Sequence, residues 1–100
     1  METVKQPSAK HKGELLEILS LAAKDSALLD AFLKDILTPA EYREVVTRWQ
    51  ILKLLAQGSV HREIMSDLKI GIATVTRGSR VLENPTGGAN QMIHKLIHRK

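Results

Sequence analysis

The sequence has no cysteine and only one residue each of tryptophan, tyrosine and phenylalanine. Without cysteine the fold holds neither a disulfide nor a zinc–thiolate site, and such a composition is typical of a reducing compartment. No apolar run reaches the 18 or so residues that a membrane-spanning helix needs, and the N-terminal residues lack the apolar segment of a secretory signal. We therefore expect a cytoplasmic protein without a membrane partner.

The patterns of catalytic and metal sites are also missing. The sequence shows no paired nucleophile and base and no glycine-rich phosphate loop, so we expect no enzymatic activity and no catalytic residue. His94 and His98 have the i, i+4 spacing of metal ligands on a helix, but no carboxylate pattern accompanies them. We expect these histidines to face solvent, and we expect no metal and no cofactor.

Positive charge is concentrated in the second half of the chain. Residues 1–50 hold seven Lys and Arg against eight Asp and Glu, a balance of −1, whereas residues 51–100 hold eight against three, a balance of +5. Between positions 71 and 82 there are two Arg and no acid. This asymmetry indicates a polyanionic partner, nucleic acid before a membrane surface, and the alternative is a solvated basic face.

Apolar residues recur with helical spacing through most of the chain, so we expect an all-α fold. Residues 1–12 are polar and interrupted by Pro7, and we expect a flexible arm there, ahead of a helical domain at 13–100. The first apolar series covers 15–23, and Ser26 is then in place to cap a second helix. A break at 84–88 precedes a last amphipathic helix with a basic end.

A capping box marks the start of the longest helix. Thr38 stands at the N-cap position, Pro39 at the first helical position and Glu41 three residues after the cap. The two positions of a hydrophobic staple around this box hold Leu37 and Tyr42. We predict a helix that starts at Pro39 and runs to Gly58, which suits the position just after a helix end.

The segment that follows has the pattern of a helix-turn-helix. Ser59 can cap a short helix over 60–68, the turn at 69–71 contains a glycine, and a second helix over 72–83 follows. The side chains that we expect to pack these helices together are Ile64, Leu68, Ile70, Val75 and Leu82. Those that we expect to face outward, with the size and polarity that suit a DNA major groove, are Ala73, Thr74, Thr76 and Arg77. The helix-turn-helix at about 60–83 is the predicted nucleic-acid interface, and plain core packing of two short helices is the alternative.

Two stretches, LTPAEYREVVTRWQI (37–51) and GIATVTRGS (71–79), closely resemble the Trp repressor family. The Trp repressor is itself one of the standard examples of how a helix-turn-helix docks in the major groove of DNA. The resemblance covers roughly residues 15–83. It implies six helices per chain and an intertwined homodimer, consistent with the limited core that 100 residues bury alone. It also implies L-tryptophan as corepressor and a palindromic operator as the double-stranded DNA partner, with two recognition helices about 34–36 Å apart.

The resemblance implies that the tryptophan ligand is bound by Leu37, Thr38, Arg48, Thr74, Arg77 and Gly78. A zwitterion with an indole ring needs a cation for its carboxylate and flat surfaces for its ring, and two guanidinium groups supply both. Gly78 is expected to leave room for the ring. Each residue also has a plainer interpretation, with Arg48 as an exposed helix residue, Thr38 as a helix cap and Gly78 as a point of close packing.

The resemblance implies DNA contacts by His61, Arg62, Ile72, Ala73, Thr76 and Arg77. Arg62, at the start of the first motif helix, is suited to hold a phosphate. Three positions depart from the family pattern. Met65 replaces a basic residue used for DNA, Lys69 replaces a glycine of the turn, and Val81 replaces a serine that helps to hold the ligand's amino group. The loop at 58–61 is also one residue shorter than the usual form.

The sequence thus predicts a dimeric, tryptophan-activated transcriptional repressor that binds operator DNA through its helix-turn-helix. Val81 keeps open a DNA-binding regulator of the same fold that has a different ligand or none. A third hypothesis is a helical dimerisation module whose basic face binds a protein. Such a module neutralises no phosphates, so it would show no steep loss of DNA affinity with salt.

Overall fold

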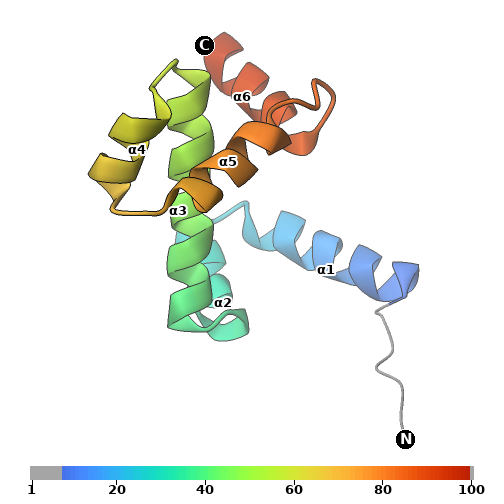
Figure 1. The fold of residues 1–100 in the computed structure, drawn as a ribbon. Helices are drawn as coiled ribbons and strands as arrows, with labels where there is room; N and C mark the ends of the chain where they lie inside the picture. Colours follow the sequence, from blue (N-terminus) through green and yellow to red (C-terminus); the bar gives the residue numbers. More distant parts are fainter. Residues whose placement is uncertain (1–7, 100) are drawn as a thin grey trace, which may run out of the picture. The chain divides into compact units, whose positions relative to one another are not determined.

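The computed structural model describes residues 8–99, which form six α-helices and no β-strand (Figure 1). The helices are α1 (Ala9–Ala22), α2 (Ser26–Ile36), α3 (Pro39–Ala56), α4 (His61–Leu68), α5 (Ile72–Val81) and α6 (Gly88–His98). The all-helical prediction and its six helices are confirmed. Of the arm expected at 1–12, residues 1–7 lie outside the described part, and residues 9–12 form the first turn of α1.

The chain divides into two compact units, residues 1–42 and 43–100. We call their described parts the N-terminal unit (8–42) and the C-terminal unit (43–99). Most of α3 belongs to the C-terminal unit, and its first turn belongs to the N-terminal unit. No helix in either described part is long and apolar enough to cross a membrane.

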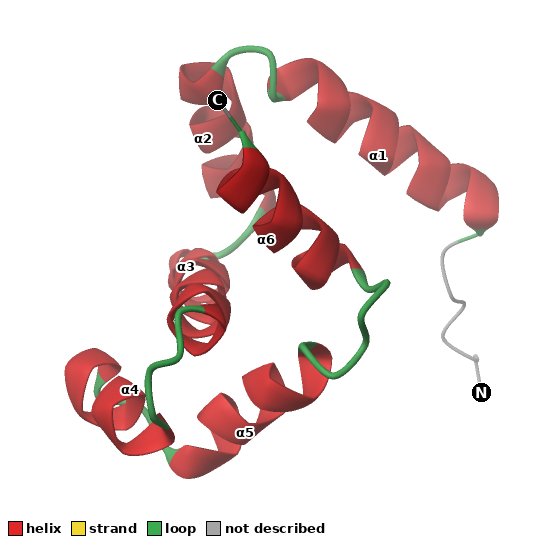
Figure 2. Ribbon diagram, turned by 90° about the horizontal axis from the view of Figure 1, so that it is seen from above, coloured by secondary structure: helices red, strands yellow, loops and turns green. Residues whose placement is uncertain are grey.

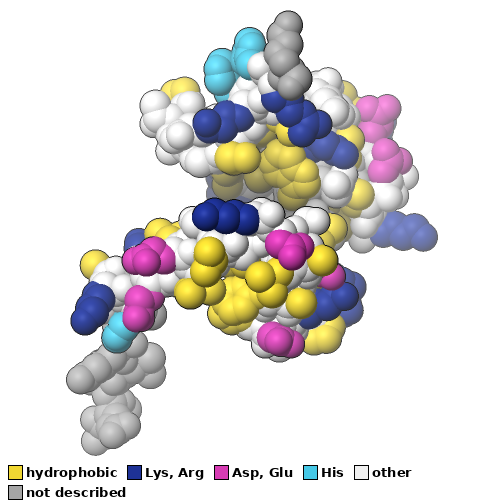
Figure 3. Space-filling view, turned by 180° about the vertical axis from the view of Figure 1, so that it is seen from behind, with side chains coloured by type: hydrophobic (Ala, Val, Ile, Leu, Met, Phe, Trp, Pro, Cys, Tyr) yellow, Lys and Arg dark blue, Asp and Glu magenta, His cyan; other side chains and the backbone are white. Residues whose placement is uncertain are grey.

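The N-terminal unit is a pair of helices with little buried surface. The Ser8 hydroxyl accepts a hydrogen bond from the His11 N–H at the start of α1. The expectation that Ser26 caps α2 is wrong, because the neighbouring Asp25 is the N-cap and its carboxylate accepts from the Ala27 and Leu28 N–H groups. Ala22 is the only buried residue of this unit's helices, and Figure 3 shows apolar side chains open to solvent over α1 and α2.

The predicted capping box is present at the start of α3. The Thr38 N–H donates to Glu41 Oε1 at 2.8 Å, and the Glu41 N–H donates to Thr38 Oγ1 at 3.1 Å. The hydrogen bond from the Thr38 N–H to the carboxylate, and after it the Thr38 hydroxyl beside that carboxylate, hold the pKa of Glu41 below its usual range. One turn away, the Tyr42 hydroxyl donates to Asp30 Oδ1 at 2.8 Å, which joins α2 to the start of α3.

The predicted end of α3 at a glycine is confirmed. Gly58 has φ 92°, a left-handed conformation that glycine adopts without steric cost. The Ser59 N–H donates to the Leu54 carbonyl at 3.0 Å and the Gly58 N–H donates to the Leu55 carbonyl at 3.0 Å. This pair of bonds is a Schellman motif, which satisfies the last carbonyls of the helix and turns the chain toward α4.

The core of the C-terminal unit is made where α3, α4 and α5 meet. Ile51, Ile64 and Val75, one residue from each helix, are at most 1% exposed. Side chains packed around them are Leu54, Leu55, Met65, Leu68 and Ile70. Four of the five residues expected to join the helix pair therefore belong to this core, whereas Leu82 is only half-buried and lies outside it.

Two boundaries of the helix pair differ from the prediction. Ser59 does not cap α4, which begins at His61 after Val60 as N-cap. The second helix ends at Val81 and not at residue 83, because residues 82 and 83 form a turn that leads to α6.

Side-chain amides join α6 to the end of α5. Asn90 Nδ2 donates to the carbonyls of Leu82 and Asn84 at 2.9 and 2.8 Å, and Gln91 Nε2 donates to the Thr86 carbonyl at 2.8 Å. Figure 2 looks down α3 and shows α4, α5 and α6 arranged around it. The long helix α3 is therefore the scaffold on which the helix-turn-helix is mounted.

Candidate functional site

A cavity of about 420 Å³ lies between α3 and α5, within the C-terminal unit. It is lined from α3 by Glu44, Arg48, Ile51 and Leu52, and from α5 by Ala73, Thr74, Arg77, Gly78 and Val81. This volume is within the range of about 300–1,000 Å³ that is usual for small-molecule sites. The mixture of a mostly apolar wall with a few charged groups is also typical of such sites.

The charged groups of the cavity come from both helices. Arg48 on α3 and Arg77 on α5 supply two guanidinium groups, and Glu44 supplies one carboxylate. The Arg48 guanidinium donates to Glu44 Oε1 at 2.6 Å, and the two side chains are 48% and 59% exposed. Because this ion pair is open to water, it contributes little to stability.

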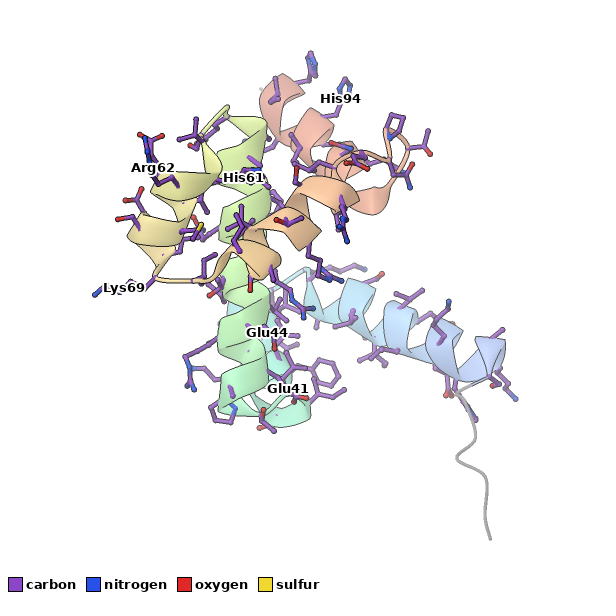
Figure 4. All side chains as sticks on the ribbon, in the orientation of Figure 1. Glu41, Glu44, His61, Arg62, Lys69 and His94 are labelled. Atoms are coloured by element: carbon purple, nitrogen blue, oxygen red, sulfur yellow. The ribbon has the colours of Figure 1, made fainter. Side chains whose placement is uncertain are left out.

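Glu44 was not among the residues predicted from the sequence. The signal that reveals it is the i, i+4 spacing from Arg48, which places both side chains on the same face of α3. Figure 4 shows Glu44 on α3. Its presence changes the electrostatics of the site, because the cavity carries a formal charge of +1 in place of +2.

Four of the six predicted ligand residues lie together in this cavity: Arg48, Thr74, Arg77 and Gly78. Leu37 and Thr38 belong to the N-terminal unit, where Leu37 ends α2 and the Thr38 hydroxyl takes part in the capping box. Their contact with a ligand stays a prediction.

Gly78 has a structural reason to be a glycine that is independent of any ligand. A Cβ atom at this position would lie 2.7 Å from Ile51 Cγ2 and 3.4 Å from Leu55 Cδ1. The glycine therefore lets α5 approach α3 closely, which supports the close-packing interpretation. Its expected second role, leaving room for an indole ring, stays a prediction.

The predicted DNA-contacting residues lie on the surface of α4 and α5. Arg62, Ile72, Ala73 and Arg77 are exposed, and His61 and Thr76 are half-buried. Ile72 is 53% exposed at the first position of α5. Figure 4 shows His61 and Arg62 at the start of α4.

The first turns of α4 and α5 lack side-chain caps. Val60 and Gly71 are their N-cap residues, and like Gly87 at the start of α6 they make no side-chain hydrogen bond to the helix, whereas Ser8, Asp25 and Thr38 cap α1, α2 and α3. The free N–H groups at the start of a helix are donors that suit a phosphate. The helix-turn-helix thus presents both cationic side chains and backbone donors on its surface.

Residues 8–99 contain no group of three or more side chains that could hold a metal ion. The rings of His94 and His98 lie 4.3 Å apart between centroids, both exposed on α6. Two such histidines without a third ligand do not make a site of the usual zinc type.

Comparison with known proteins adds a second line of argument. The family model described as Trp repressor protein matches residues 11–97. A Trp operon repressor homolog of Vibrio cholerae is 34% identical over 95 residues, which cover 94% of this chain and 91% of the relative. A Trp operon repressor homolog of Photobacterium profundum is 33% identical over 88 residues, 87% of this chain and 82% of the relative. One from Vibrio vulnificus is 40% identical over 69 residues, 68% of each chain. No solved structure gave a significant match.

Proposed function

This chain belongs to the Trp repressor family, and from this premise we propose that it is a tryptophan-dependent repressor of transcription. Two copies form a homodimer, each copy binds L-tryptophan between α3 and α5, and the dimer then binds a palindromic operator through α4 and α5. The observation that carries the proposal is the position of Arg77. It lines the cavity and is exposed on the proposed recognition helix, so the same helix faces ligand and DNA.

The chemistry of the cavity supports tryptophan as the ligand. Arg77 and Arg48 offer cations for the carboxylate, and their planar guanidinium groups suit the two faces of an indole ring. Each such cation–π contact contributes about 0.5–2 kcal/mol, depending on its exposure. The apolar wall, including Ile51 and Leu52, provides the rest of the surface that a bicyclic ring buries.

The surface of α5 supports DNA as the partner. The segment 69–81 contains three cations, Lys69, Arg77 and Arg80, and no acid. Cations of this kind neutralise phosphates, and the exposed Ala73 and Ile72 offer methyl groups that match the thymine methyl in the major groove. A helix with this composition is suited to the recognition position of a helix-turn-helix.

The N-terminal unit supports the homodimer. Its exposed large apolar side chains are Leu15, Leu16, Ile18, Leu21, Leu28 and Ile36. With Ala22 as the only buried residue of α1 and α2, this unit has too little core to be stable by itself. A second copy of the chain covers these faces, which is how the intertwined arrangement of the family completes its core.

Ligand and DNA are coupled through α5. The cavity has walls from α3 and α5, so a bound ligand fixes the angle between the recognition helix and its scaffold. If this angle matches the spacing of the two halves of the palindromic operator, binding of the ligand raises the affinity for DNA. By linkage, DNA then raises the affinity for the ligand by the same factor. Couplings of this kind usually amount to about 5–150-fold.

A second candidate function is favoured by Val81. This residue lines the cavity and offers methyl groups but no acceptor for an ammonium group. The one carboxylate of the cavity, Glu44, is already paired with Arg48, and with the two arginines it leaves the cavity a formal charge of +1. An aromatic carboxylate without an amino group would match such a site. The chain would then be a DNA-binding regulator of the same fold with a different ligand.

Calorimetric titration with L-tryptophan and with indole-3-propionate, its analogue without the amino group, separates these functions. Tighter binding of L-tryptophan, at one site per chain, supports the leading proposal. Tighter binding of indole-3-propionate favours the second candidate. Absence of heat with either ligand contradicts both ligand assignments.

A further inference from the structure

Lys69, between α4 and α5, has the left-handed backbone conformation that glycine usually takes. Its φ is 55° and its ψ is 52°, and within residues 8–99 no other non-glycine residue has a positive φ. The Lys69 N–H and the Ile70 N–H both donate to the Met65 carbonyl and so end α4. A side chain in this conformation has a steric cost that glycine and asparagine largely avoid. Such residues gather at functional sites, so this lysine needs a reason to be there.

The side chain of Lys69 does not stabilise the fold by a visible contact. It is exposed, and Figure 4 shows it directed away from α4 and α5. The ion pairs within the described residues join Lys34 to Asp30 and Arg48 to Glu44, so Lys69 has no carboxylate partner there. Within residues 8–99 the steric cost of the backbone is therefore not offset by an ion pair of the Lys69 side chain.

The charge pattern of α4 indicates what Lys69 supplies. The helix carries one arginine, Arg62, against the acids Glu63 and Asp67, and its centre holds the half-buried Met65, which packs against the core. Without Lys69 the helix would present a net negative charge to DNA, with its cation at one end only. Seven residues separate Arg62 from Lys69, roughly 10 Å at 1.5 Å of rise per residue. Along one strand of a duplex the charges are about 3.4 Å apart on the axis, so Arg62 and Lys69 can meet different phosphates.

We propose that Lys69 is a phosphate-binding residue, which grips the DNA backbone from the turn when the start of α5 enters the major groove. Lys69 stands only two residues before Gly71, the N-cap of α5, so its ammonium can reach the edge of that groove. Together with Arg62 it holds the backbone at both ends of α4. This inference rests on the proposed DNA-binding function.

Binding to a mixed-sequence DNA duplex tests this role, because a phosphate contact needs no particular base sequence. The dimer, saturated with L-tryptophan, is titrated by fluorescence anisotropy between about 50 and 200 mM salt. Lys69→Asn and Lys69→Gly both accept the left-handed conformation and remove the charge. Each is expected to weaken binding and to lower the slope of log K against log salt by about 1.8, which is about 0.9 for one phosphate contact in each of the two chains of the dimer. Lys69→Arg is expected to keep the slope.

Thermal unfolding supplies the second measurement. Lys69→Gly is expected to raise Tm by a few degrees, because the steric cost disappears, while it weakens DNA binding. A residue retained only for the turn would not produce these opposite changes. Lys24→Asn removes one charge from the exposed α1–α2 turn and is the control for net charge, with the slope expected to stay unchanged.

Three outcomes overturn the inference. One is an unchanged salt slope in Lys69→Asn and Lys69→Gly, and another is an equal loss of slope in Lys24→Asn. The third is an unsubstituted chain that shows no salt-dependent binding to the duplex. This third result contradicts the proposed function itself, whereas the first two contradict only the role of Lys69.

Discussion

Gly78 of α5 faces Ile51 of α3 so closely that a Cβ atom at position 78 would lie 2.7 Å from Ile51 Cγ2. Ile51 is 1% exposed at the centre of the C-terminal core, so it has little freedom to move aside. Gly78 also lines the cavity. The same close approach of α5 to α3 thus determines both the stability of the helix-turn-helix and the shape of the proposed ligand site.

The first prediction concerns this contact. Gly78→Ala is expected to lower the free energy of unfolding by about 1–3 kcal/mol, the usual cost of overpacking a core. Gly13→Ala is the matched control, because Gly13 lies inside α1 with no atom within 4 Å of its Cβ position. There the same substitution is expected to stabilise the helix by about 0.5–1 kcal/mol. Chemical denaturation measures both. If Gly78→Ala is no less stable than Gly13→Ala, the close contact does not constrain α5.

The contrast between Gly58 and Gly78 shows which features the sequence predicts. The capping box at Thr38 and the C-terminal Gly58 depend on residues a few positions apart, and both were predicted correctly because their hydrogen bonds are local. The contact of Gly78 with Ile51 joins residues 27 positions apart, so no local pattern contains it.

The errors in the helix starts have a different cause. Asp25 and Ser26 are adjacent and both have short oxygen-bearing side chains, so propensity alone cannot choose between them. At α4 the chain leaves the Schellman motif after Ser59, and the extended Val60 becomes the N-cap without any side-chain bond. Ser59 thus belongs to the end of α3, through its N–H bond to the Leu54 carbonyl, and not to the start of α4.

The second prediction tests the cavity. Arg77→Ala removes one of the two guanidinium groups and is expected to weaken L-tryptophan binding about tenfold or more, the equivalent of 1.4 kcal/mol. Arg80→Ala is the control, because Arg80 is exposed on the same helix but does not line the cavity. Calorimetry measures both affinities directly, without DNA. Equal losses in the two variants would mean that general charge, and not the position of Arg77, holds the ligand.

The third prediction concerns pH. The carboxylate of Glu41 accepts a hydrogen bond from the Thr38 N–H, and its pKa is lowered. Since the folded state favours the charged form, the stabilisation is present above the unfolded pKa of about 4.3 and is lost as pH falls through the folded pKa. Glu41→Gln keeps the hydrogen bonds of the box without a titrating group. At pH 7 the unsubstituted chain is expected to have a higher Tm than this variant. The difference between the two Tm values should shrink below pH about 4. If the difference in Tm stays constant across this pH range, ionisation of Glu41 is not its cause.

The fourth prediction concerns the homodimer. Leu16 on α1 is 55% exposed, and Leu16→Glu places a charge on the face that a second copy is proposed to cover. The substitution is expected to shift the chain from dimer to monomer and to lower Tm, as measured by sedimentation equilibrium and thermal unfolding. Lys10→Gln, also exposed on α1, changes the net charge by the same amount and is expected to leave the dimer intact. A monomeric unsubstituted chain at micromolar concentration would contradict the dimer.

The central claim is that the ligand cavity controls DNA binding through α5, and one measurement tests it most directly. A pool of random duplexes is selected for binding to the dimer in L-tryptophan, and the affinity for the selected duplex is then measured with and without the amino acid. The account predicts a palindromic sequence with half-sites about one helical turn apart, bound about 5–150-fold more tightly with L-tryptophan. Equal affinity with and without L-tryptophan would contradict it.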